Sequence, residues 1–265
     1  MQDTSFTAEL TSAELASADL PAADLLAQRV ILVTGAGQGL GRTAALSFAA
    51  HGATVILLGR HLKRLESVYD EIVAAGYPQP LIFPLDLEKA TEQDYAAMAE
   101  GIHQALGRLD GILHNAAHFN NPSPLEIQTT AQFETMLRVN LIAPFALTKA
   151  CLPLLKRAQD AAVLFTLSSY GHEPKAYWGA HGISKAALEH MLQAWALELE
   201  QIPGLRLNGI IPGPVQSPQR RKSHPGELHQ DLPAASSLMA TYLYLMGPDS
   251  VGISGKVLLA LADRE

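Results

Sequence analysis

A short apolar run that leads directly into a glycine-rich turn constrains the fold of this chain most. Residues 30–33 read VILV, and the turn after them is Thr34-Gly35-Ala36-Gly37-Gln38-Gly39-Leu40-Gly41. Glycine allows a tight turn and a close approach of the backbone to a ligand, and a helix after the turn presents unpaired N–H groups to an anion. This order is typical of a dinucleotide-binding α/β fold.

The spacing of the glycines selects one form of this turn. The common G-x-G-x-x-G pattern fails because Leu40 stands where its last glycine would fall counting from Gly35, whereas T-G-x-x-x-G-x-G fits in full. A glycine-rich turn can also be a plain strand-to-helix connection. Its place after the first apolar run favours the binding role.

Short apolar runs alternate with helix-length segments along the rest of the chain. The runs cover residues 30–33, 54–58, 81–83, 111–114, 161–167, 205–211 and 256–261. The segments between them cover residues 42–51, 62–75, 90–105, 133–158, 183–202 and 234–246. Because strands covered on both faces read as continuous apolar runs, we expect one doubly wound Rossmann-type domain with a mainly seven-stranded parallel sheet and helices on both faces.

The first residues differ in composition from the rest of the chain. Residues 1–28 contain five acids and no Lys or Arg, with leucines at every fifth position from Leu10 to Leu25. Four such repeats are too few to bury a core of their own. We therefore expect a weakly ordered tail over residues 1–23 and the Rossmann-type domain over residues 24–265; the alternative for the tail is a specific docking segment.

Composition narrows the class of partner. The formal net charge is −7, so a basic face for nucleic acid is not expected, and a small-molecule substrate is favoured. The single cysteine, Cys151, predicts neither an intramolecular disulfide nor a structural metal site. Without a secretory signal or a long uncharged apolar run, we expect a cytoplasmic protein with no membrane span.

The end of the second apolar run indicates the cofactor. It reads Leu57-Leu58-Gly59-Arg60, so the acid that would bind the adenosine ribose hydroxyls of NAD(H) is missing. Arg60 offers a charge-assisted grip on a 2′-phosphate instead, which predicts NADP(H) rather than NAD(H). The alternative is that Arg60 is a solvated residue at a helix start.

Further motifs occur in a fixed order after these. They are Asp86-Leu87, Asn115-Ala116-Ala117, Asn140 and Pro212-Gly213-Pro214-Val215-Gln216-Ser217. With the glycine turn, they resemble the short-chain dehydrogenase/reductase family from about Asp24 to the C-terminus, and several segments look most like its bacterial YciK-type branch. The resemblance implies a cofactor site built from Thr34, Gly35, Gly37, Gln38, Gly39, Leu40, Gly41, Arg60, Asp86, Leu87, Asn115, Ala116, Lys185, Pro212, Gly213, Val215 and Ser217.

The resemblance also implies a catalytic serine, a tyrosine and a lysine four residues after that tyrosine. Here Lys185 is preceded at that spacing by His181, and Ser168 lies 13 residues before His181, with Ser169 as a second choice. Lys185 is expected to hold the nicotinamide ribose, Ser168 to orient the substrate oxygen, and Asn140 to hold a water. An imidazole beside a lysine ammonium should be neutral at pH 7 and can accept a proton, although it reaches less far than a phenol.

Several residues near this position keep two interpretations. Tyr170 and Tyr177 either contribute a hydroxyl or only pack. His114, His118 and Phe119 either contact substrate or belong to an exposed turn, and the run Arg220-Arg221-Lys222 with His224 either attracts an anion or is a solvated face.

Two functions are therefore expected. The first is an NADP(H)-dependent oxidoreductase that transfers hydride between nicotinamide and a secondary alcohol or carbonyl, as a homodimer or homotetramer packed through the helices that contain Asn140 and Lys185. The second is a catalytically impaired protein of this type that binds NADP(H) as a sensor or interaction module.

Overall fold

A seven-stranded parallel sheet forms the centre of the molecule, in the order β3-β2-β1-β4-β5-β6-β7. The structure is a computed structural model, and it describes residues 21–260. The strands are β1 (Val30–Thr34), β2 (Thr54–Gly59), β3 (Leu81–Pro84), β4 (Gly111–His114), β5 (Ala161–Thr166), β6 (Leu205–Ile211) and β7 (Val257–Leu259). The prediction of a doubly wound sheet is confirmed, and every strand pair is parallel.

The strands are apolar because both faces of the sheet are covered. All five residues of β1 are buried. Successive side chains of a strand point to opposite faces, so Leu32 joins one core cluster while Ile31 and Val33 join the other. The uninterrupted apolar pattern of the sequence follows from this double burial.

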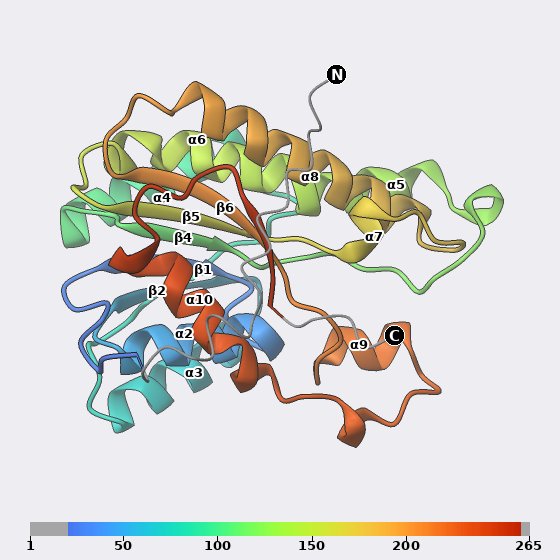
Figure 1. Cartoon of the computed structure of the whole chain (residues 1–265), viewed down its shortest axis with the longest axis horizontal. Helices are drawn as coiled ribbons and strands as arrows, with labels where there is room; N and C mark the ends of the chain where they lie inside the picture. The colour runs from blue at the N-terminus through green and yellow to red at the C-terminus, as the bar shows by residue number, and fades with distance from the viewer. Residues whose placement is uncertain (1–20, 261–265) are drawn as a thin grey trace.

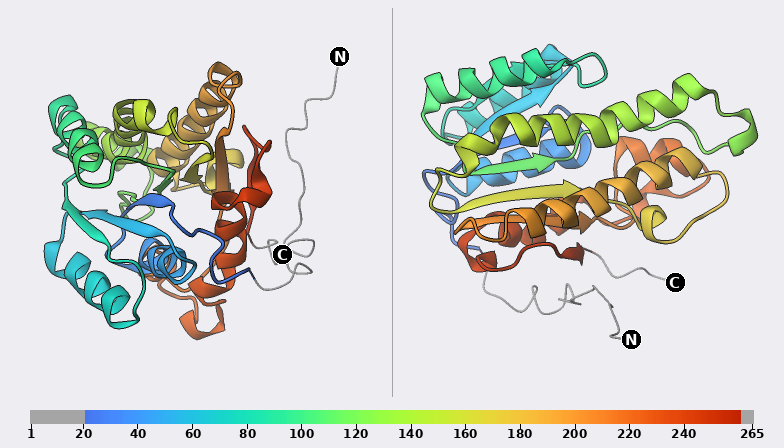
Figure 2. Two further views of the ribbon diagram at one scale, coloured as in Figure 1. Left: turned by 90° about the vertical axis from the view of Figure 1, so that its left-hand side faces the viewer. Right: turned by 90° about the horizontal axis from the view of Figure 1, so that it is seen from above.

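Helices form a layer on each side of the sheet (Figures 1 and 2). One layer contains α4 (Glu92–Leu106), α6 (Ala143–Leu155) and α8 (Gly179–Glu198). The other contains α2 (Gly39–Ala50), α3 (Leu62–Ala74) and α10 (Met239–Met246). The shorter elements are η1 (Leu125–Ile127), α5 (Thr130–Leu137), η2 (Arg138–Ile142), α7 (Ser169–His172), α9 (Pro218–Ser223), η3 (His229–Asp231), η4 (Ala235–Leu238) and η5 (Pro248–Ser250).

The helix predicted over residues 133–158 differs from the observed one. It starts earlier because Thr129 and Gln132 form a capping box, and a π-helical segment, η2, separates α5 from α6. The extra residue per turn turns Asn140 into the protein interior, where it is 1% exposed. The continuous run Thr130–Leu155 is long and apolar enough to cross a membrane by length and composition, but it packs against α4 and α8 as a core helix.

Other helix ends also differ from the expected ones. α2 starts at Gly39, three residues before the prediction, because its first turn is part of the glycine-rich turn, where no apolar period exists. α8 begins at Gly179 rather than residue 183, and a 3-10 turn precedes the shorter α10. At the N-terminal side, Leu26 is fully buried, while residues 1–20 of the predicted tail lie outside the described residues.

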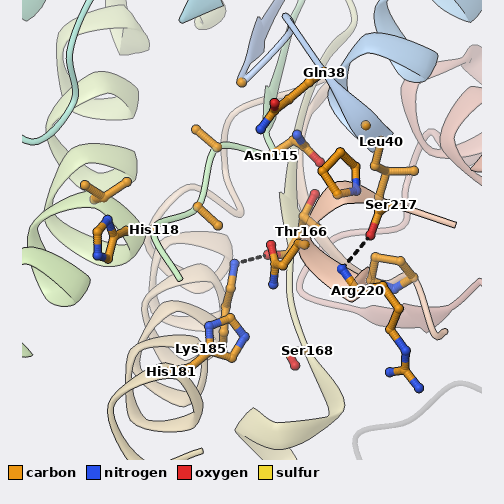
Figure 3. Close-up of a pocket in the computed structure, with 18 of the residues that line it drawn as sticks. Gln38, Leu40, Asn115, His118, Thr166, Ser168, His181, Lys185, Ser217 and Arg220 are labelled. Atoms are coloured by element: carbon orange, nitrogen blue, oxygen red, sulfur yellow. Dashed lines mark hydrogen bonds between the residues drawn. The ribbon is translucent and has the colours of Figure 1, made fainter. Parts of the chain in front are cut away.

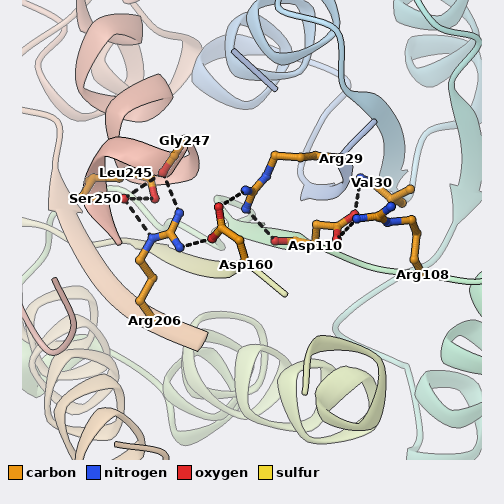
Figure 4. A network of polar contacts seen from close by, with 9 residues as sticks. All are labelled: Arg29, Val30, Arg108, Asp110, Asp160, Arg206, Leu245, Gly247 and Ser250. Carbon is orange, nitrogen blue, oxygen red and sulfur yellow. Dashed lines mark hydrogen bonds and ion pairs between the residues drawn. The ribbon is translucent and has the colours of Figure 1, made fainter. Parts of the chain in front are cut away.

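A buried ionic network connects residues at the amino-terminal edge of the sheet (Figure 4). The Asp160 carboxylate, just before β5, accepts hydrogen bonds from both Arg29 and Arg206. Arg206 also donates to the Ser250 hydroxyl at 2.9 Å, and Arg29 donates to the Asp110 carbonyl at 3.2 Å. The network thereby connects β1, β5, β6 and the segment before β7 on the side of the sheet away from the candidate site.

Candidate functional site

A cavity of about 1150 Å³ lies beyond the carboxyl ends of the strands. It includes the point between β1 and β4 where the strand order reverses, which is where open α/β sheets bind ligands. Figure 3 shows part of its lining. The predicted residues that line it are Gly35, Gly37, Gln38, Gly39, Leu40, Arg60, Asp86, Leu87, Asn115, Ala116, Ser168, His181, Lys185, Pro212, Gly213, Val215 and Ser217.

Thr34, Gly41 and Asn140 are not part of that lining but support it from behind. The Thr34 hydroxyl accepts hydrogen bonds from the backbone N–H groups of Asn115 and Ala116, each at 3.0 Å. This side chain fixes the loop after β4 against the end of β1. A Cβ added at Gly41 would lie 2.4 Å from the Asn115 amide nitrogen and 2.5 Å from the Gly35 carbonyl oxygen, so the turn requires glycine there.

The glycine turn itself depends on backbone conformations that glycine favours. Gly35 and Gly39 have φ angles of +69° and +54°. The loop after β6 closes against this turn, because a Cβ at Gly39 would lie 3.1 Å from Pro218. The Ser217 side chain caps α9 by accepting a hydrogen bond from the Arg220 N–H at 3.0 Å. The predicted motifs after β1 and β6 therefore form one wall.

The adenosine end of the predicted cofactor site contains two guanidinium groups. Arg60 stands at the end of β2 and lines the cavity, as expected. Arg64, in the first turn of α3, also lines it and hydrogen-bonds the Gln38 side chain. Arg64 was not predicted from the sequence. Two features could have indicated it: it lies four positions after Arg60, and the first turn of the helix that contains it has no acidic residue.

At the opposite end, Lys185 lies deep in the cavity wall. Its ammonium group donates a hydrogen bond to the Thr166 carbonyl at 2.6 Å, which anchors α8 to the end of β5. Burial lowers the pKa of Lys185 to about 8. An ammonium group with this pKa exchanges protons near neutral pH.

His181, one helical turn before Lys185, is enclosed by aromatic rings. Phe119 and Trp178 approach its ring edge-on with centroid distances of 5.4 and 5.7 Å. Its Nδ1 is buried without a hydrogen-bond partner among the described residues. Burial first, and the charge of Lys185 second, lower the pKa of His181 to about 3. The neutral imidazole expected from the sequence is favoured, but burial is the larger cause.

Ser168 and Ser169 both line the cavity, so the structure keeps both as candidate hydroxyls. Ser168 caps the short helix α7 by accepting a hydrogen bond from the Tyr170 N–H at 3.4 Å. Tyr170 stacks on Trp178, and its hydroxyl lies 3.4 Å from the His224 ring nitrogen. Sequence reasoning missed Trp178, which lines the cavity, because only the fold brings it against Tyr170 and His181.

Asn140 forms a clamp between three segments. Its side-chain oxygen accepts from the His118 N–H at 2.7 Å, and its amide nitrogen donates to the His118 carbonyl at 3.1 Å and to the Ser184 hydroxyl at 3.0 Å. Both amide hydrogens are thus committed to protein atoms. The side chain positions the loop after β4 against α8, and the expected role of Asn140 in holding a water stays a prediction.

The residues for which the sequence left two interpretations differ in burial and contacts. His114 is buried, not part of an exposed turn: it hydrogen-bonds Thr148 at 2.7 Å and stacks on Phe165. His118 and Tyr170 line the cavity, whereas Tyr177 is 59% exposed on the surface. In the basic run, Arg220 and Lys222 line the cavity, and the Arg220 Nε and Nη2 donate hydrogen bonds to the two Glu227 carboxylate oxygens at 2.6 and 2.7 Å. That pairing neutralises one of the cations expected to attract an anion.

Comparisons with known proteins agree with this architecture. The short chain dehydrogenase family model matches residues 29–228. The uncharacterized oxidoreductase YciK of Escherichia coli K12 is 42% identical over 225 residues, covering 85% of this chain and 88% of that protein.

Solved structures of short chain dehydrogenases are also similar. One from Pseudomonas syringae is 47% identical with a TM-score of 0.87, covering 92% of this chain and 99% of that one. Another, from Shigella flexneri and in complex with NADP, is 40% identical with a TM-score of 0.87, covering 90% and 99%.

Proposed function

The chain belongs to the short-chain dehydrogenase family, and from this premise we propose that it is an NADP(H)-dependent oxidoreductase acting on a secondary alcohol or carbonyl. The observation that carries the proposal is the joint lining of one cavity by the glycine turn, Arg60 and Lys185. The NADP complex of the similar Shigella flexneri protein supports the choice of cofactor.

The residues fit the cofactor on structural grounds. The absence of side chains at Gly35, Gly37 and Gly39 leaves a cradle beside the start of α2, where helix N–H groups favour a diphosphate. Asp86 and Leu87 would border the adenine. Asn115, Ala116 and the loop from Pro212 to Ser217 would border the nicotinamide half.

At the nicotinamide end of the cavity, three side chains would have separate roles. When bound, the nicotinamide group donates or accepts the hydride. Lys185 would hold the adjacent ribose, and Ser168 would orient the substrate oxygen. His181 occupies the position that the family resemblance assigns to a tyrosine, and as a neutral imidazole it would accept the proton of an alcohol during oxidation.

A second function is favoured by the state of His181. An imidazole with a pKa of about 3 carries no acidic proton at pH 7 and is a poor donor for carbonyl reduction. A protein that binds NADP(H) as a sensor or interaction module would keep the cofactor cradle and lose only this donor. The N-terminal residues 1–23 would then be a candidate docking segment.

We also propose that the protein is cytoplasmic and that it forms a homo-oligomer. The helices α6 and α8 carry the exposed apolar side chains Phe145 and Ile183, and Ile142 of η2 is exposed as well. These side chains suit a homodimer or homotetramer contact through the helices that contain Asn140 and Lys185. Light scattering at micromolar concentration measures the assembly, and a monomer at all concentrations would contradict it.

One comparison separates the two functions. The native protein, His181→Tyr and His181→Ala are surveyed with NADP(H) against a panel of secondary alcohols, aldehydes and ketones. Activity in the native protein that disappears in His181→Ala contradicts the sensor function. Activity that appears only in His181→Tyr contradicts the enzyme function and shows that the rest of the site is competent.

A further inference from the structure

We propose that Arg64 is a second phosphate-binding residue at the adenosine end of the cavity, acting together with Arg60, and that Gln38 positions it. This inference rests on the proposed use of NADP(H). It adds Arg64, which was not expected from the sequence, as a specificity-determining residue, and it gives Gln38, which was expected at the cofactor site, a positioning role.

The two guanidinium groups border the same space. Arg60 directly follows β2, and Arg64 lies in the first turn of α3, whose N-cap is His61. Arg60, His61 and Arg64 all line the cavity. Two arginines can bind the three outer oxygens of a phosphate monoester from two directions, whereas a ribose hydroxyl offers one or two neutral acceptors.

Gln38 holds the Arg64 side chain across the site. The Gln38 side-chain oxygen accepts a hydrogen bond from the Arg64 Nη1, which joins the glycine turn to α3. The backbones are also close at this point, since a Cβ at Gly37 would lie 3.0 Å from the Arg64 Cβ. A guanidinium has five N–H donors, so this bond leaves others for a ligand. Fixing the side chain beforehand reduces the entropy that binding must overcome.

The surrounding charges distinguish Arg64 from its neighbours. Arg42, in the first turn of α2, is paired with Glu71 of α3. Lys63 is exposed on the same helical turn as Arg64 but does not line the cavity. The cavity acids nearest along the fold, Asp86 and Glu88, follow β3, and the end of β2 contains no acid that would repel a phosphate.

The test is a binding measurement that needs no substrate. NADPH and NADH are titrated by nucleotide fluorescence into the native protein, Arg64→Gln, Arg60→Gln and the matched control Lys63→Gln. We expect Arg64→Gln to weaken NADPH binding by about tenfold to a hundredfold, the range for one charge-assisted hydrogen-bonding group. The affinity of Arg64→Gln for NADH should change by less than about twofold, because NADH has no 2′-phosphate to lose a contact. Lys63→Gln should leave the affinities for both nucleotides unchanged, because Lys63 does not line the cavity.

The outcomes separate this inference from the proposed function. If the native protein shows no saturable NADPH binding, the proposed function fails. If it binds NADPH and Arg64→Gln behaves like Lys63→Gln, only the role of Arg64 fails. An equal loss for NADPH and NADH would also overturn the inference, because the residue would not distinguish the phosphate.

Gln38 is tested through a double-mutant cycle with Arg64. Gln38→Ala should weaken NADPH binding in the native background more than in the Arg64→Gln background, since its effect acts through the guanidinium. Thermal unfolding of the unliganded variants checks that the turn is intact. Equal losses in both backgrounds would overturn the positioning role and assign Gln38 only a direct contact with the cofactor.

Discussion

His181 and Lys185 lie one turn apart on the buried face of α8, 5% and 4% exposed, and both have lowered pKa values. The ammonium group has a carbonyl partner in Thr166, whereas the imidazole Nδ1 has no partner among the described residues. A base without a counter-charge in this environment remains neutral. The pair therefore holds one positive charge at neutral pH, on Lys185.

This relationship predicts how stability depends on acid pH. The pKa of His181 is about 3 in the folded protein and near 6.5 when unfolded, so between these values the unfolded chain binds more protons and stability falls as the pH falls. Removing the titrating group with His181→Phe should make the loss of unfolding free energy between pH 7 and pH 5.5 smaller by about 1 kcal/mol. Urea unfolding of both proteins at both pH values measures this difference.

The apolar ring in this variant suits the enclosure formed by Phe119 and Trp178, so the substitution keeps the packing. His114→Gln tests the same pH effect at a second buried imidazole, because burial lowers the pKa of His114 to about 3 as well. If His181→Phe and the native protein lose the same stability over this interval, the imidazole is not held neutral and the interpretation of the site is wrong.

The network around Asp160 predicts a large loss of stability. Asp160→Asn leaves the charges of Arg29 and Arg206, whose side chains are 10% and 2% exposed, without their carboxylate. Breaking a buried ion pair by removing one partner costs about 3–5 kcal/mol, and the 26% exposure of Asp160 places the expectation at about 2–4 kcal/mol. Urea unfolding provides the value.

Glu92→Gln is the matched control for this experiment. It breaks the pair between Lys149 and Glu92, whose side chains are 58% and 77% exposed, and should cost less than about 0.5 kcal/mol. Similar losses in the two variants would contradict the view that burial makes the Asp160 network important.

Two glycine substitutions should act in opposite directions. Gly41→Ala places a methyl group against the Asn115 amide and the Gly35 carbonyl, so it should destabilise the protein by about 1–3 kcal/mol and weaken NADPH binding at least tenfold. Gly101→Ala, inside α4 with nothing within 4 Å of the added Cβ, should stabilise it by about 0.5–1 kcal/mol. Thermal unfolding and NADPH titration of both variants check the contrast; tight binding by Gly41→Ala would show that the turn has room to adjust.

Much of the fold was predictable because burial on both faces leaves a clear apolar pattern in each strand. All seven strands were located, and even β7 differed only at its ends. The helix ends were less predictable. α2 begins inside the glycine turn, and the π-helical segment at Asn140 interrupts a helix whose sequence shows no break.

The candidate site was predictable where a strand end supplies the residue. Arg60, Asp86, Asn115 and Ser168 each follow a strand, and the parallel sheet brings them to one edge. Contacts between side chains of different segments left no such pattern. The stack of Tyr170 on Trp178, the bond between Gln38 and Arg64, and the commitment of the Asn140 amide depend on three-dimensional packing.

The central claim is that the cavity binds NADP(H) beside Trp178, one of two tryptophans in the chain. The direct measurement is a titration of the native protein with NADPH, following tryptophan emission and comparing Trp178→Phe with Trp195→Phe. We expect saturable quenching in the native protein and in Trp195→Phe, and a much smaller quench in Trp178→Phe although it still binds the nucleotide. A native protein whose emission and nucleotide fluorescence show no saturable response to NADPH would contradict the claim.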